Sequence, residues 1–225
     1  MAFDPSPIWI SLKTSLAATS LALVFGVSAA HWRERRKNSL WLAFDGVCLL
    51  PMVLPPTVVG FFLLLLFGRN GPLGIVLMHL GAIVVFSWPA TVIAATVVSF
   101  PLVYVTARGA LAQVDPALLD AARTLGASEG RVFRRIALPL AVPGIFAGAT
   151  LAFARALGEF GATLMLAGNI PGRTQTLPVA IYFDIEAGRT HDAFGAVLVV
   201  LAVTSAVLAA LALWARAQGR SSQRG

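Results

Sequence analysis

Five runs of mainly apolar residues, each long enough to cross a lipid bilayer, constrain what this chain can fold into. They cover residues 8–30, 40–67, 86–107, 138–157 and 193–215. A spanning helix needs about 20 such residues. The hydrophobic fraction of 58% and charged fraction of 12% also depart from soluble domains, which are about 45–50% apolar and a quarter charged. We therefore predict one all-α, polytopic membrane domain over residues 1–225, with its embedded core at about 8–215.

Two shorter apolar stretches and several prolines leave the number of spans at five or six. Residues 72–85 are short and interrupted by glycine, which fits a re-entrant segment, an interfacial segment or a sixth span; residues 162–170 are too short to cross. Pro51, Pro55 and Pro56 lie inside the second run, and proline kinks or breaks a helix. In lipid, such a break needs protein or water around the freed carbonyls. The prolines indicate either packing kinks or broken backbone lining a pathway.

The distribution of basic residues predicts the orientation. Three segments that lie on one side of the predicted spans carry twelve of them, and the opposite side carries Arg69, Arg173 and Arg189. The twelve are Arg33, Arg35, Arg36, Lys37, Arg108, Arg123, Arg131, Arg134, Arg135, Arg216, Arg220 and Arg224. By the positive-inside rule their side is cytoplasmic. With five spans the N-terminus is then periplasmic and the C-terminus cytoplasmic.

Residues 115–139 form a hydrophilic loop with the pattern of two short helices. Asp115 suits an N-cap, Pro116 the first helical position, and Gly126 the stop after the helix. An apolar face of Leu118, Ala121, Ala122 and Leu125 recurs at helical spacing, and Ser128 with Glu129 begins the second helix. This face must be buried either on the membrane surface or in a groove of a partner protein.

This loop resembles the EAA loop of ABC importer permeases. That motif reads Glu-Ala-Ala, three residues, Gly, nine residues, then Ile-x-Leu-Pro. The matching residues here are Asp120, Ala121, Ala122, Gly126, Ile136, Leu138 and Pro139, and Asp for Glu is the single departure. The resemblance implies the type I ABC importer permease fold and a coupling helix that docks on a separate ATP-hydrolysing subunit.

A second resemblance, which covers nearly the whole chain, concerns the substrate. Residues 153–163, 168–182, 54–60 and 99–102 resemble molybdate permeases, and sulfate permeases carry a related version of part of this pattern. Arg155 and Glu159 lie at i,i+4. They are either an ion pair that positions the helix or a source of positive potential along an oxyanion path. Arg173 and Arg189, in the outer segment 168–191, are candidate contacts of a periplasmic binding protein.

The sequence also limits what the chain does alone. It has no Gly-x-x-x-x-Gly-Lys-Ser/Thr loop and no recognisable catalytic or metal-ligand arrangement, so we predict that it is not an enzyme and holds no cofactor, ATP and Mg²⁺ being bound by the partner. We predict a homodimer, two ATPase copies, a bacterial inner-membrane location and no nucleic-acid partner. The rival functions are an ion-coupled secondary transporter and a membrane scaffold. Asp45 and His31 are interpreted as ordinary interfacial or loop residues.

Overall fold

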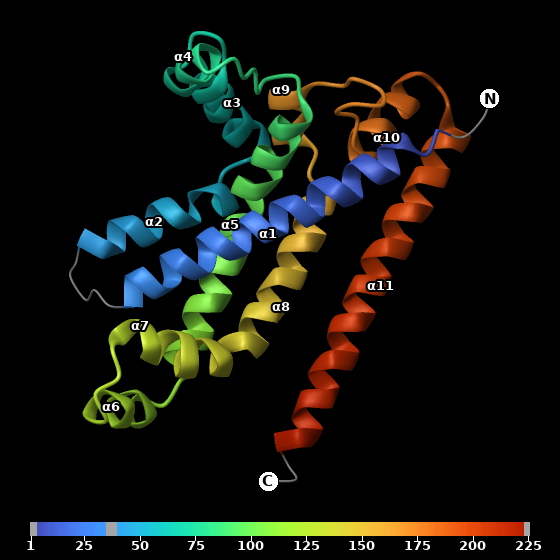
Figure 1. Ribbon diagram of the computed structural model, residues 1–225. Coiled ribbons are helices and arrows are strands. Elements are labelled where there is room, and N and C mark those ends of the chain that lie inside the picture. Colours follow the sequence, from blue (N-terminus) through green and yellow to red (C-terminus); the bar gives the residue numbers. More distant parts are fainter. Residues whose placement is uncertain (1–3, 35–39, 223–225) are drawn as a thin grey trace.

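The computed structural model describes residues 4–34 and 40–222, and every regular element in that part of the chain is helical. Figure 1 shows how the helices are arranged. They are α1 (Ser6–Glu34), α2 (Leu40–Val53), α3 (Pro56–Phe67), α4 (Pro72–His79), α5 (Trp88–Ala112), α6 (Pro116–Thr124), α7 (Glu129–Val132), the π-helical turn η1 (Phe133–Ala137), α8 (Leu138–Leu157), α9 (Gly161–Ala167), α10 (Leu177–Glu186) and α11 (Thr190–Ser222). Arg35, Arg36, Lys37 and Arg224, which the orientation argument used, lie outside the described residues.

Four helical segments in the described part of the chain are long and apolar enough to cross a membrane. They are Ser6–Glu34, Trp88–Ala112, Glu129–Leu157 and Thr190–Ala210. The predicted run 40–67 is not one continuous helix, because α2 and α3 meet at an angle of 114°. Pro55 and Pro56 cause this break, since neither can donate the backbone bond that would continue α2. Counting the bent pair as one crossing gives five, because α4 has only eight residues.

Helices α1, α5 and α8 form the centre of the bundle, where small residues allow close approach. Gly26 of α1 faces the backbone of α5, and a Cβ at that position would lie 3.2 Å from the amide nitrogen of Tyr104. A Cβ at Gly148 of α8 would lie 2.8 Å from Cβ of Thr106 in α5. In lipid, where apolar side chains gain little by leaving the solvent, such close backbone packing holds helices together.

The two largest apolar clusters along α5 lie one toward each end, and two smaller clusters also include residues of α5. The first, called the hairpin-end core because it adjoins α6 and α7, has these buried residues: Ala30, Cys48, Tyr104, Ala107, Leu111, Ala137, Ala141 and Ile145. The second, called the far core, has these: Val59, Leu63, Ala90, Ala94, Val98, Ala162, Leu166 and Ala167. Helix α2 therefore packs in the hairpin-end core and α3 in the far core. The bend between them, residues 54–55, is called the elbow.

The two ends of the bundle differ in structure. Helices α6 and α7 form one end, whereas α4, α9 and α10 lie at the other (Figure 1). Helix α11 packs mainly on α10 and α8 and returns along the bundle to the end that carries α6. Helix α1 thus begins at the end opposite to the one where α11 finishes, as an odd number of crossings requires.

Candidate functional site

Helix α6 is a short, exposed helix with a well-defined start. The side chain of Asp115 accepts a hydrogen bond from the Ala117 amide at 2.9 Å, and Pro116 occupies the first helical position. This satisfies one of the amides that a helix start leaves unpaired. The predicted cap and helix are therefore present as the sequence indicates.

The turn after α6 fixes the direction of the chain into α7. Gly126 has a φ of +81°, the left-handed region in which glycine carries no steric penalty. Its amide donates to the carbonyl of Arg123 at 2.9 Å, and the Ala127 amide donates to the carbonyl of Ala122 at 3.0 Å. These paired bonds form a Schellman motif, which ends a helix without leaving its last carbonyls unpaired.

Arg123 joins the two helices of this hairpin through its side chain. The guanidinium contacts Asp120 of α6 at 2.7 Å and Glu129 of α7 at 2.7 Å, with a second bond to Glu129 at 3.3 Å. The hydrogen bond to Glu129, which has the larger effect, and the hydrogen bond to Asp120 both raise the pKa of the Arg123 guanidinium. The fork geometry of arginine makes this a bracket across the Gly126 turn. We call residues 115–132 the α6–α7 hairpin.

The apolar face of α6 has no complete cover in the described structure. None of its residues is buried, and Leu118 and Leu125 have exposed fractions of 49% and 88%. Asp120 and Ala121 are exposed beside Gly126, and Ala122 is half-buried. An apolar helical face displayed in this way, on a braced hairpin, is suited to insertion into a groove of another protein.

The second predicted helix is not a separate element. Helix α7 continues through η1 into α8, and the Leu138 amide donates to the carbonyl of Phe133, five residues earlier. Such π-turns insert a residue without ending the helix. Ile136 and Leu138 are therefore half-buried in this continuous segment, and Pro139 is exposed in the first turn of α8, rather than at the tip with Asp120. The ring of Phe133 stacks on His31 of α1 with centroids 3.6 Å apart.

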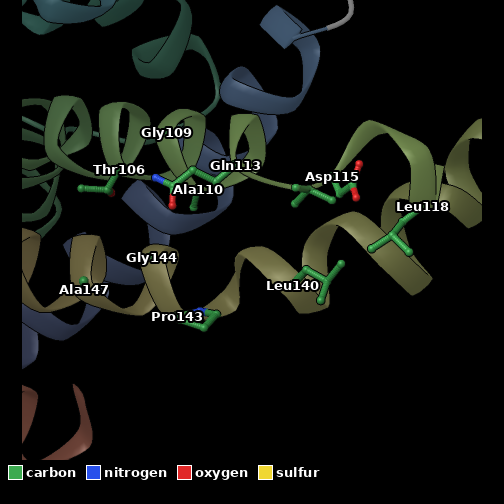
Figure 2. Close-up of a pocket in the computed structure, with 11 residues that line it drawn as sticks. Thr106, Gly109, Ala110, Gln113, Asp115, Leu118, Leu140, Pro143, Gly144 and Ala147 are labelled. Carbon is green, nitrogen blue, oxygen red and sulfur yellow. The ribbon is translucent and has the colours of Figure 1, made fainter. Parts of the chain in front are cut away.

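A groove of about 600 Å³ lies between α5 and α8 beside the hairpin (Figure 2). Small residues form its walls, among them Gly109 and Ala110 of α5 and Gly144 and Ala147 of α8. Leu118 of α6 borders one end, as Figure 2 shows. The groove thus connects the membrane-spanning core to the hairpin.

Arg155 and Glu159 are brought together at the end of α8 by the predicted i,i+4 spacing. Arg155 Nη1 donates to Glu159 Oε2 at 2.7 Å, and Glu159 Oε1 accepts from the amide of Ala162 at 2.8 Å. Glu159 is only 2% exposed. Both carboxylate oxygens are therefore used to hold the end of α8 against the start of α9.

The two outer arginines lie in different settings. Arg173 is exposed in the loop between α9 and α10. Arg189 donates from Nη2 to Asp184 at 2.6 Å and lies 4.0 Å from Asp192, at the junction of α10 and α11. A cavity of about 270 Å³ opens beside this junction. Arg189 lines this cavity, whereas Arg173 is not among its lining residues.

Asp45 was wrongly interpreted as an ordinary residue. It is 6% exposed and contacts three side chains from two neighbouring helices. Arg33 Nε lies 3.1 Å from both carboxylate oxygens, Arg108 Nη1 lies 2.9 Å from Oδ1, and the Tyr104 hydroxyl donates to Oδ1. The available signal was an acidic residue inside an apolar run, which in a membrane demands a partner. Within the described residues, no group of His, Cys, Asp and Glu side chains could hold a metal ion.

The family match and the fold together place the chain in a class of protein, the inner-membrane permeases of ABC importers. The fold is similar to that of the methionine ABC transporter MetNI in inward-facing conformations, with a TM-score of 0.74 at 17% identity over 94% of each chain. It also resembles an amino acid ABC transporter solved with histidines, with a TM-score of 0.64 at 20% identity over 96% of this chain and 99% of the other. The chain belongs to the family described as binding-protein-dependent transport system inner membrane components, which it matches over residues 22–222.

Proteins with similar sequences include permeases of molybdenum and sulfate transport systems. The chain is 41% identical to the putative molybdenum transport system permease protein YvgM of Bacillus subtilis, over 90% of each chain. It is 48% identical to the molybdenum transport system permease protein ModB of Escherichia coli K12, over 80% of this chain and 79% of ModB. A sulfate transport system permease protein, CysW of Synechocystis, is 36% identical over 90% and 74%. The predictions of a multi-pass inner-membrane protein and of a transport subunit rather than an enzyme are therefore confirmed.

Proposed function

We propose that this chain is the permease subunit of an ATP-driven importer that carries molybdate across the inner membrane by alternating access. The observation that carries the proposal is the braced α6–α7 hairpin, whose apolar face is exposed at one end of a set of membrane-spanning helices. A separate ATPase supplies the energy, and ATP and Mg²⁺ bind there rather than to this chain. Molybdate is assigned from the molybdenum permease relatives, and tungstate, an oxyanion of the same shape and charge, is an expected second substrate.

The hairpin is the proposed contact with the ATPase. Asp120, Ala121, Ala122 and Gly126 lie at its tip, where small side chains allow close approach to a groove. The Schellman turn and the Arg123 bracket make the hairpin stiff, so a displacement at its tip is passed into α8. Ile136, Leu138 and Pro139 form the continuous helical segment that receives the displacement.

A two-fold homodimer completes the pathway in this proposal. Four long helices and one bent pair are too few to enclose a polar path alone, and two-fold pairing is the commonest assembly of identical chains. We assign the small-residue groove between α5 and α8 (Figure 2) to the contact with the second copy. Each copy then presents one hairpin, so two ATPase copies are bound.

The proposed orientation places the hairpin in the cytoplasm. Arg131, Arg134 and Arg135 are all exposed close to the start of α8, and basic residues concentrate on the cytoplasmic side of membrane proteins. The N-terminus is then periplasmic and the C-terminus cytoplasmic. Arg173 and Arg189 lie at the periplasmic end, where we assign them to contacts with a soluble binding protein.

Arg155 has a structural role in this proposal. Its charge is neutralised by Glu159 at 2.7 Å, so it contributes little net field to an oxyanion path. The positive potential for a dianion must then come from other groups. Of the two interpretations of Arg155 and Glu159, we therefore favour the ion pair that positions the helix over a source of potential for the anion path.

Reconstitution tests the function. The chain, its co-encoded ATPase and its binding protein are placed in proteoliposomes with ATP, and molybdate, tungstate and sulfate uptake are measured by inductively coupled plasma mass spectrometry. ATP-dependent molybdate uptake supports the proposal. Sulfate uptake in preference to molybdate supports the sulfate alternative, which the CysW relative favours. Uptake driven by a proton gradient without ATPase would overturn the ABC assignment.

The hairpin assignment has its own test. Gly126→Pro cannot adopt the φ of +81°, because proline holds φ near −65°. We expect ATP hydrolysis to continue while uptake falls at least about tenfold, a change equal to about 1.4 kcal/mol of coupling. Gly130→Ala is the matched control, because a Cβ there meets no atom within 4 Å. Normal uptake in Gly126→Pro would count against docking through this hairpin.

A further inference from the structure

The bent pair α2–α3 connects the two apolar cores. Helix α2 contributes Cys48 to the hairpin-end core, and α3 contributes Val59 and Leu63 to the far core. Helix α3 also packs closely on α9, since a Cβ at Gly60 would lie 2.8 Å from Cα of Ala162. The elbow between α2 and α3 is therefore a place where the angle between these two helices can change while each stays packed in its own core.

Helix α2 is attached to the hairpin-end core by the apolar side chains of Cys48, Phe44 and Leu49 and by one polar point. Most of its large apolar side chains are exposed: Leu42, Val47, Leu50, Met52 and Val53. On its buried side, Asp45 binds Arg33 of α1 and both Tyr104 and Arg108 of α5. Around this point Phe44 packs edge-on against Tyr104, with ring centroids 6.3 Å apart. We call Asp45 with its three polar partners the α2 pin.

The α2 pin lies beside the contact between α1 and the hairpin. Phe133 of η1 stacks on His31, which precedes Arg33 by two residues in the same helix. Phe133 and Leu119 of α6 also pack against the hairpin-end core, to which Tyr104 belongs. A continuous set of packed side chains therefore leads from α6 through the end of α1 to α2.

We propose that Asp45 is a positioning residue for transport, which makes α2 move with the α6–α7 hairpin so that the elbow passes this motion to α3 and α9. This inference rests on the proposed import function. When the ATPase shifts the hairpin, η1 and the end of α1 move with it, and the pin carries α2 along. The elbow then changes its angle, and the far core, which lies toward the other side of the membrane, follows.

The chemistry of the pin suits positioning better than stability. Burying a carboxylate is costly even when it is paired, and apolar replacements of such pairs are often equally stable. The pair does fix geometry, because a carboxylate has two oxygens in fixed positions and Arg33 engages both. Arg33 of α1 and Arg108 of α5 bind the same carboxylate, so the pin ties α2 to both helices. A purely apolar contact at this position would let α2 slide or rotate against α1 and α5.

The test uses the reconstituted complex with molybdate and compares Asp45→Asn with Asp45→Glu. Asparagine keeps the size of the side chain but removes its charge, whereas glutamate keeps the charge. We expect Asp45→Asn to retain ATP hydrolysis within about twofold while molybdate transported per ATP falls at least about fivefold. Asp45→Glu is expected to recover at least half of the wild-type ratio. A residue needed only for folding would lower hydrolysis and uptake together through the amount of assembled complex.

Double electron–electron resonance, which measures the distance between two spin labels, tests the proposed motion of α2 and the elbow directly. Labels at Leu42 and Arg134, in a Cys48→Ser background, report α2 against η1, which directly continues the hairpin, and labels at Leu42 and Leu65 report the elbow. We expect the first distance to stay constant between nucleotide-free and ATP-trapped wild-type complexes, while the second changes. In Asp45→Asn the first distribution is expected to broaden.

The outcomes separate this inference from the proposed function. If the wild-type complex shows no ATP-dependent uptake, the proposed function fails. If the wild-type complex transports and Asp45→Asn keeps the wild-type ratio of molybdate to ATP, only the inference about Asp45 is overturned. A wild-type elbow distance that stays fixed through the nucleotide cycle likewise overturns it.

Discussion

Exchanging a glycine and an alanine across the α5–α8 contact tests the close packing on which the bundle depends. A Cβ at Gly144 would lie 2.6 Å from Cβ of Ala110, while the next-nearest atom, Cα of the same residue, would lie at 3.6 Å. The clash therefore involves a single methyl group. Removing that methyl by Ala110→Gly should make room for the methyl that Gly144→Ala adds.

The magnitudes follow from these contacts. Gly144→Ala forces an overpacked contact that costs about 1–3 kcal/mol, offset by up to about 1 kcal/mol because alanine favours a helix over glycine. Its net effect is about 0–2 kcal/mol of destabilisation. Ala110→Gly costs about 1 kcal/mol by the same helix preference. In the double variant the two preferences cancel and the clash disappears, so the free energy of unfolding should return to within about 0.5 kcal/mol of wild type.

Unfolding in mixed micelles with a rising mole fraction of sodium dodecyl sulfate, followed by far-ultraviolet circular dichroism, measures these differences. Gly109→Ala serves as the control, since it lies in the same groove but a Cβ there meets no atom within 4 Å. It should leave stability unchanged or raise it slightly. If the double variant lost as much stability as the two single variants added together, the close approach of α5 and α8 at this point would be refuted.

Three further predictions concern single groups. Asp115→Ala should weaken α6 by about 0.5–2 kcal/mol through loss of its N-cap, seen as faster amide hydrogen exchange in residues 116–124, with Asp115→Asn as the conservative control. Glu159→Ala should destabilise the chain by roughly 3–5 kcal/mol because it leaves Arg155 part-buried without its counter-charge, and a lowered unfolding midpoint checks this. The hydrogen bond to Glu186 raises the pKa of Tyr182 above its usual value near 10, so this bond contributes stability below pH 10 that is lost as pH rises through the elevated pKa. An ultraviolet titration in which Glu186→Gln leaves the phenol titration unchanged would contradict this.

The sequence predicted the elements whose rules are local. The apolar runs located the crossings, and the helix grammar of residues 115–126 located α6, its Asp115 cap and its Gly126 stop. These features depend on residues within about one helical turn of each other, so the amino-acid sequence alone is enough to predict them. The position of Arg155 beside Glu159 follows from the same spacing rule.

Two features of the fold depend on contacts or backbone geometry that the local sequence pattern does not contain. Pro55 and Pro56 predict an interruption of the helix. The bend of 114° also depends on the packing of α3 against α9, where Gly60 permits close contact. The continuation of α7 through η1 into α8 was not predicted from the sequence either. The prediction of a second short helix that includes Ile136, followed by a separate span from Leu138, was wrong, because a π-turn lets the helix continue without a break that the apolar pattern would reveal.

Asp45 marks the limit of reading each residue by itself. Placed alone in an apolar run, it resembled an interfacial residue, because its partners come from the end of an earlier run and the end of a later one. A carboxylate at that depth cannot remain unpaired without a large free-energy cost, so the sequence already required cations on neighbouring helices. Arg33 and Arg108 are the basic residues that stand at the ends of the first and third runs, on the side that the charge bias calls cytoplasmic. The pairing of a buried acid with the basic ends of adjacent spans therefore carries three-dimensional information. In this chain the pairing joins α2 to both α1 and α5.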